Sequence, residues 1–203
     1  MSTVTHEPAE SAPRSGRPRD ARADRAIIDA TLDLIAERGV HAFRTEDVAS
    51  RAGVGKGTIY RRYPSKDDLV TAAVGALVDQ EIVVPDTGST RSDLLVLMRE
   101  AVALYSGERP GRLMPKLVSA MAERPELART IRSGFLAARR AALAEVLRRG
   151  IDRGDLRRDL DVEFALDLLG GPLFYRRLIT GGPIDDRLAQ NVVELMVLGL
   201  APQ

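Results

Sequence analysis

The chain has 203 residues and an almost balanced charge, with 30 Lys and Arg against 29 Asp and Glu. Its content of 44% hydrophobic and 29% charged residues is ordinary for one medium or two small globular domains. The absence of Cys excludes disulfides, thiolate zinc sites and thiol nucleophiles. His6 lies in a Pro- and Ser-rich start, so His41 alone remains, and neither a His-pair metal site nor a Ser-His triad is expected.

Apolar residues recur at helical spacing almost throughout, which predicts an all-α chain of about nine helices. A polar, basic leader is predicted to be disordered over residues 1–21. The first four helices are predicted at residues 22–38, 45–53, 56–63 and 65–85. Thr45 and Ser65 are the predicted N-caps of the second and fourth helices, and the apolar stripe of the fourth continues to Val78.

Five further helices are predicted after the linker-like run PDTGST at residues 85–90. Their approximate bounds are residues 94–105, 113–121, 127–149, 161–179 and 185–200. The run Gly170-Gly171-Pro172 lies inside the eighth helix, although Gly and Pro both disfavour a helix interior. We therefore expect a kink or the close approach of another helix at this point.

The segment TEDVASRAGVGKGTIYRRYPSKDDL, residues 45–69, predicts a helix-turn-helix. Val48, Val54 and Ile59 are spaced to form an apolar seam between its two short helices. Ala49 is small where the helices must approach closely, and Gly53 suits a turn with positive φ. The same pattern also occurs in ordinary packed helix pairs, so the exposed face must be considered as well.

The exposed face of the third helix is predicted to carry hydrogen-bond donors and aromatic rings without an acid. Its residues are Lys56, Thr58, Tyr60, Arg61, Arg62 and Tyr63. A helix of this kind fits the major groove of B-DNA. Upstream, Arg14 and the run SGRPRD that follows it, with Arg17 and Arg19, resemble a flexible basic arm that enters a minor groove. Residues 14–66 carry a formal charge of +5 and the remainder −4, which favours DNA binding by the first part.

The pattern TxxDVAxxAGVxKGTIYRRYPSKxxL, behind a helix that ends in ERG, resembles the DNA-binding domain of TetR/AcrR-type transcriptional regulators. The resemblance is close over residues 26–70, although Gly55 stands where the family commonly has Ser. It implies that Lys56, Thr58 and Arg61 face the bases, and that phosphates are contacted by Thr45, Tyr60, Tyr63 and Lys66. The run RGDLRRDLD and the following GGPLFYRRLITGGPID look like a recurrent C-terminal subtype of these regulators.

The resemblance also implies that residues 69–203 form an effector-binding and dimerisation domain behind a DNA-binding domain at residues 22–68. The large or adaptable side chains expected around the family's effector pocket are Tyr105, Met114, Met121, Phe135, Phe174 and Tyr175. The last two helices are expected to form the dimer interface, through Leu168, Leu169, Pro172, Leu188, Val192, Leu195 and Met196.

We therefore expect a cytoplasmic homodimer without cofactor or metal that binds a palindromic operator in double-stranded DNA. A small apolar or amphipathic effector is expected to release it, as a repressor. Two alternatives are an effector-free activator or architectural protein, and a helical enzyme or carrier using the carboxylates near Asp155. The second alternative is disfavoured because no His or Cys lies beside those carboxylates. No signal peptide or membrane span is expected from the sequence.

Overall fold

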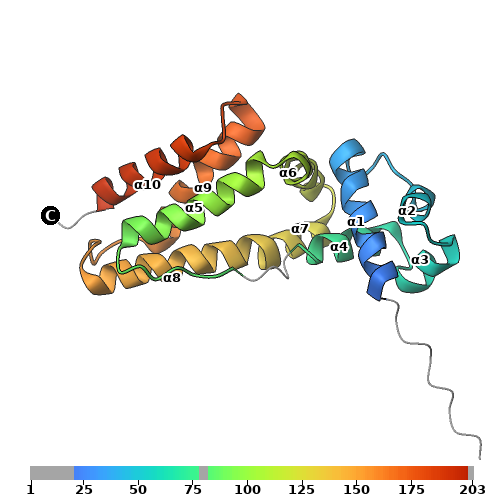
Figure 1. The fold of residues 1–203 in the computed structure, drawn as a ribbon, viewed down its shortest axis with the longest axis horizontal. Helices are drawn as coiled ribbons and strands as arrows, with labels where there is room; N and C mark the ends of the chain where they lie inside the picture. The colour runs from blue at the N-terminus through green and yellow to red at the C-terminus, as the bar shows by residue number, and fades with distance from the viewer. Residues whose placement is uncertain (1–20, 78–81, 201–203) are drawn as a thin grey trace, which may run out of the picture.

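A computed structural model describes residues 21–77 and 82–200, and within these ranges the chain is helical without a strand (Figure 1). Three helices gather at one end of the molecule: α1 (Ala21–Arg38), α2 (Thr45–Ala52) and α3 (Lys56–Arg62). The next helix, α4 (Lys66–Gly75), packs on α1 and leads into the larger helical body. None of the described helices combines the length and apolarity needed to cross a bilayer.

The helical body is built from α5 (Thr90–Ser106), α6 (Glu108–Met121), α7 (Pro125–Thr130), α8 (Ala137–Arg153), α9 (Val162–Tyr175) and α10 (Asp186–Leu200). A π-helical turn, η1 (Ile131–Leu136), joins α7 to α8 in one rod, and a second, η2 (Arg176–Thr180), extends α9. Counted as rods, the described residues therefore form the nine helices that were predicted. α5 packs against α8 on one side and α10 on another, while α6 packs against α1 (Figure 1).

The predicted caps of the first unit are partly wrong. Arg44, not Thr45, is the N-cap of α2, because the Arg44 N–H donates to Asp47 Oδ2 at 2.7 Å and the Asp47 N–H to the Arg44 carbonyl at 3.0 Å. Thr45 is the first helical residue and is buried. The cap of α4 is confirmed, since Ser65 Oγ accepts the Asp68 N–H at 3.1 Å. α4 is shorter than predicted and ends at Gly75, and Val78 lies outside the described residues.

The predicted linker at residues 85–90 is held by side chains of the body. Arg149 donates to the Pro85 carbonyl at 2.5 Å and pairs with Asp86 at 3.2 Å. The fully buried carboxylate of Asp93 accepts the Thr87 N–H at 2.8 Å and the Thr87 hydroxyl at 2.7 Å. The segment is therefore a loop tied to the ends of α5 and α8.

Pro115 interrupts the backbone hydrogen bonding inside α6. A proline lacks the N–H that would bond the carbonyl four residues earlier, so the Gly111 carbonyl has no helical partner. Arg177 of η2 donates to this carbonyl through Nη2. The end of the α9 rod is thereby joined to the middle of α6.

Of the two explanations expected for Gly170-Gly171-Pro172, the close approach of another helix is not found within this chain. A Cβ at Gly170 or Gly171 would meet nothing within 4 Å, so no helix of the same chain approaches closely. Pro172 lies inside α9, and the helix widens into the π-helical turn η2 shortly after it. By contrast, the helix predicted over residues 127–149 continues through Gly150, and Gly154, the second of the two glycines expected to mark its end, is the cap of α8. A Cβ at Gly150 would lie 2.5 Å from Thr90 Oγ1 and 2.9 Å from Thr90 Cγ2.

We predict that Gly150→Ala destabilises the protein, although Ala is the better helix former. The added methyl group collides with Thr90 at the start of α5, and overpacking of this kind costs about 1–3 kcal/mol. Urea unfolding at fixed protein concentration measures the change. The matched control is Gly199→Ala in the last turn of α10, where the methyl group meets nothing within 4 Å and a gain of up to about 1 kcal/mol is expected. Equal stability of the two variants would contradict the prediction.

Candidate nucleic-acid interface and effector cavity

The turn between α2 and α3 has the geometry that the sequence predicted. Gly53 has a φ of +65°, in the left-handed region that favours glycine, and the Val54 N–H donates to the Ala49 carbonyl at 3.0 Å. Ile59 of α3 is completely buried, so α3 is fixed to the core by one side. The opposite side of this short helix is left for a ligand.

The three residues predicted to face bases lie on or beside that open side. Lys56 and Arg61 are exposed, whereas Thr58 is half-buried. Tyr60, predicted to contact phosphate, is 47% exposed between them. The structure therefore leaves a surface of two cations and one phenol on α3, which matches the donors that DNA phosphates and base edges accept.

Arg62 does not belong to this surface. Its Nε pairs with Asp24 Oδ1 of α1 at 2.9 Å, and only 17% of its side chain is exposed. The sequence placed it on the exposed face because helical spacing alone cannot identify a partner on another helix. Arg62 instead attaches α3 to α1, and the contact adds to the buried anchor Ile59.

Lys66 is also held within the chain. Its ammonium donates to the carbonyls of Phe43 at 2.6 Å and His41 at 3.2 Å, and it lies 4.3 Å from the centre of the Phe43 ring. Burial is the largest cause that lowers the pKa of Lys66. Two of its three donors thus stabilise the loop before α2. Of the other residues predicted to contact phosphate, Tyr63 is half-buried and Thr45 is buried. The residues of the predicted minor-groove arm, Arg14, Arg17 and Arg19, lie outside the described residues.

Glu46 is the acid that sequence reasoning missed at this surface. Its carboxylate lies 3.3 Å from Lys56 Nζ, so α2 places a negative charge beside the open side of α3. The pKa of Glu46 is lowered, first by a hydrogen bond from its own backbone N–H and then by Lys56. The sequence could have indicated this acid, because Glu46 lies in the first turn of the helix that precedes α3.

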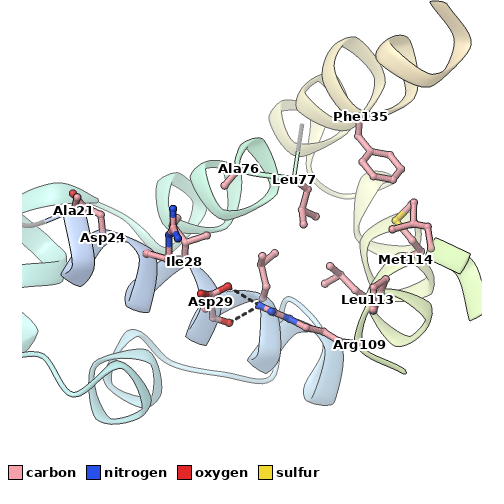
Figure 2. A pocket seen from close by; sticks show the side chains of 14 residues that line it. Ala21, Asp24, Ile28, Asp29, Ala76, Leu77, Arg109, Leu113, Met114 and Phe135 are labelled. Carbon is pink, nitrogen blue, oxygen red and sulfur yellow. Dashed lines mark hydrogen bonds and ion pairs between the residues drawn. The ribbon is translucent and has the colours of Figure 1, made fainter. Parts of the chain in front are cut away.

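A cavity of about 690 Å³ lies between the DNA-binding unit and the helical body. Figure 2 shows Ala21 and Asp24 of α1 at one end and Met114 and Phe135 at the other, with Leu77 and Leu113 between them. Its remaining lining residues are Arg25, Ile28, Asp29, Leu32, Ala76, Leu104, Arg109 and Pro110. A volume of this order, with mainly apolar walls and a few charged groups, is typical of sites for small organic ligands.

Arg109 of α6 bridges the wall of this cavity to α1. Its Nη2 donates to the Asp29 carbonyl at 2.9 Å (Figure 2), and its Nε pairs with Asp33 Oδ1 at 2.7 Å. No pattern in the sequence indicates this contact, because the two helices are far apart along the chain. It joins the part that carries α3 to the part that carries most of the apolar wall.

Only Met114 and Phe135 of the six predicted pocket residues line this cavity. Tyr105 is buried and its ring packs edge-on against Phe174, with 5.3 Å between the centroids. Met121 is half-buried outside the lining. The prediction for Tyr175 is wrong, because its side chain is 59% exposed on the outer side of α9.

The residues predicted for the dimer interface fall into a buried group and an exposed group. Leu169 and Leu188 are incorrect, because they are 0% and 4% exposed in the core of their own chain, and Val192 and Met196 are nearly as buried. Leu168 and Leu195 are exposed, and Pro172 is half-buried. Further exposed apolar side chains continue the surface. We call the full set the apolar stripe: Phe164, Leu168, Tyr175, Ile179, Leu195 and Leu198.

Two family models match the chain. The model for bacterial regulatory proteins of the tetR family matches residues 27–73, and the model for the tetracyclin repressor-like C-terminal domain matches residues 84–196. The uncharacterized HTH-type transcriptional regulator YdeS of Bacillus subtilis is 35% identical over 180 residues, which is 89% of this chain and 90% of YdeS. The DNA-binding transcriptional repressor TetR of Mycobacteroides abscessus is 31% identical, over 86% of this chain and 92% of the repressor.

Among solved structures, the TetR family transcription regulator SCO0332 is similar to this chain with a TM-score of 0.64 and 31% identity. The match covers 89% of this chain and 100% of SCO0332. The resemblance seen at residues 26–70 thus extends over both halves of the molecule. The chain belongs to the TetR family of bacterial regulatory proteins, and it is a transcriptional regulator rather than an enzyme.

Proposed function

We propose that the protein is a homodimeric repressor that binds a palindromic operator in double-stranded DNA and is released by a small apolar or amphipathic effector. The observation that carries the ligand response is the cavity of about 690 Å³, because its walls come from both α1 and α6. A molecule in that cavity contacts the DNA-binding unit and the helical body at once. Residues 22–68 are proposed as the DNA-binding domain and 69–203 as the effector and dimerisation domain.

The proposed coupling needs an effector that prefers one spacing of α1 and α6 over the other. Arg109 defines one spacing through its contacts with Asp29 and Asp33. An effector that lengthens these contacts moves α1, and α3 moves with it through the ion pair of Arg62 and Asp24. The two copies of α3 in a dimer then no longer match successive major grooves.

The proposed dimer interface is the apolar stripe of α9, η2 and α10. Its six large side chains are exposed in the single chain, and contiguous surfaces of this kind usually mark interaction sites. Gly170 and Gly171 lie among the α9 members of the stripe with open space above them, so a second copy of α9 has room to approach. A twofold interface places the same stripe on both subunits.

The DNA contacts are tested by binding selection and by gel shift on the upstream DNA of the protein's own gene. Tyr60→Phe is expected to weaken binding to all sequences by about the same factor, because a phosphate contact carries no base information. Arg61→Ala is expected to change the preferred sequence, with a loss of about 1–3 kcal/mol on the best site. Arg148→Ala, at an exposed arginine of α8 outside both α3 and the apolar stripe, is the control. Altered base preference in Tyr60→Phe alone would reverse the two assignments.

Glu46→Gln is expected to strengthen DNA binding up to about fivefold at low salt. The variant removes a charge that competes with phosphate for Lys56, and a surface ion pair is worth about 0–1 kcal/mol. The gain should shrink as salt is raised, since exposed charges are screened. Fluorescence anisotropy with a labelled operator measures both effects. Glu126→Gln, which breaks an exposed ion pair with Arg129 on α7, is the control. A weaker complex with Glu46→Gln would show that Glu46 positions Lys56 instead.

Leu195→Asp is expected to convert the dimer to a monomer in light scattering after gel filtration, because it places a charge within the apolar stripe. Val83→Asp is the matched control, since Val83 and Leu195 are both 73% exposed and Val83 lies outside the stripe. Loss of the dimer in both variants, or in neither, would count against this interface.

The ligand response is tested separately, by gel shift of the operator with and without candidate small molecules. A shifted band that no small molecule changes would favour the effector-free alternative.

A further inference from the structure

Arg139 is a half-buried cation whose pairing differs from that of its neighbour. It lies in the first turn of α8, with its guanidinium carbon 3.8 Å from the centre of the Phe135 ring. Among residues 21–77 and 82–200, no carboxylate oxygen comes within 4.0 Å of it, and its hydrogen bond to the Phe135 carbonyl is a long one of 3.4 Å. The next residue, Arg140, pairs with both Glu163 at 2.6 Å and Asp167 at 2.7 Å.

A buried charge without a counterion is unfavourable, and arginine cannot relieve the penalty by losing its proton in the accessible pH range. Burial lowers the pKa of Arg139 and is the largest cause of the shift. Stacking on Phe135 recovers part of the lost solvation. The guanidinium therefore retains the capacity to bind an anion that the described residues do not supply.

The surroundings of Arg139 offer room for such an anion. Arg139 lines a small cavity of about 60 Å³, roughly the volume of two liquid waters, together with Ile82, Leu97, Glu100, Ala101, Ala142 and Leu143. Glu100 is near enough for its carboxylate to favour the charged form of Arg139, but it is exposed, so solvent weakens both this attraction and its repulsion of an anion. On the other side, Phe135 contacts Arg139 and also lines the cavity between α1 and α6. One aromatic side chain thus connects the cation to the apolar site.

The backbone supports a ligand-binding role at this point. Phe135 lies in η1, and π-helical turns inside α-helices are frequent at functional sites. Tyr105 is buried close enough to Arg139 for the guanidinium charge to act on its hydroxyl. The cluster therefore combines a cation, a phenol and an aromatic ring beside an apolar cavity.

We propose that Arg139 recognises the negatively charged group of the effector, so that the effector of this regulator is an amphipathic organic anion. Its apolar body occupies the cavity between α1 and α6, and its carboxylate or equivalent group binds Arg139 past the ring of Phe135. This proposal rests on the proposed function, since it assigns a chemical class to the effector of that same cavity.

The test compares two fluorescent probes that share one aromatic body, 1-anilinonaphthalene-8-sulfonate and the uncharged N-phenyl-1-naphthylamine. With the full-length protein, the sulfonate is expected to bind about tenfold or more tightly than the neutral probe. Arg139→Leu should remove this preference and leave the affinity of the neutral probe unchanged. Arg139→Lys should keep part of it. Arg148→Leu, the same change at an exposed position of α8, should keep all of it.

Equal affinity for the two probes, or a sulfonate preference that survives Arg139→Leu, would overturn the proposal and leave the apolar cavity intact. If wild-type protein binds neither probe, the anion site is overturned as well. Gel shifts with the same proteins separate these results from the proposed function. A sulfonate preference that depends on Arg139 supports the anion site even if the probe leaves the operator complex unchanged, and in that case the ligand response is what fails. Thermal melting of Arg139→Leu checks that the variant is folded.

Discussion

The packing of α1 against α6, which Arg109 bridges, places the DNA-binding helices relative to the rest of the molecule. α4 connects the two parts covalently, but α6 meets α1 side by side, and Arg109 holds the Asp29 carbonyl and the Asp33 carboxylate across that contact. Asp29 and Arg109 also line the cavity, so this contact and the proposed ligand site share residues. A molecule cannot occupy this space without acting on the contact that orients α1. This is the physical requirement for linking two binding events in a protein without enzymatic chemistry.

Local patterns allowed the first unit to be predicted almost completely. The turn at Gly53, the buried Ile59 and the cap at Ser65 depend on residues that are neighbours in sequence, so spacing and residue type were sufficient. The helices of the body were predicted for the same reason. Thr45 failed as a cap because the choice between it and Arg44 depended on the reach of Asp47. Residue propensities locate a helix start only to within one or two residues, so they cannot decide between neighbouring positions.

Partners on other helices could not be predicted. Arg61 and Arg62 are identical in type and adjacent in sequence, yet Arg62 forms an ion pair with Asp24 whereas Arg61 is exposed. Lys66 was expected to face phosphate, whereas the carbonyls of a distant loop take two of its donors. The same limit applies to α9 and α10, which are apolar on more than one side. Leu168 and Leu169 are consecutive, and only the packed structure shows which of them belongs to the chain's own core.

The hydrogen bond from Arg177 to the Gly111 carbonyl, which Pro115 leaves without its helical N–H, affects how related sequences can diverge. Arg177 donates to the Gly111 carbonyl at the position where residue 115 supplies no N–H to that carbonyl. A chain that replaces the proline restores this N–H, which then competes with the guanidinium of residue 177 for the same carbonyl. The two positions are therefore expected to covary among homologues, one in the middle of α6 and the other at the end of α9. Such a pair would be visible in an alignment as a link between the apolar stripe and the helix that carries Arg109.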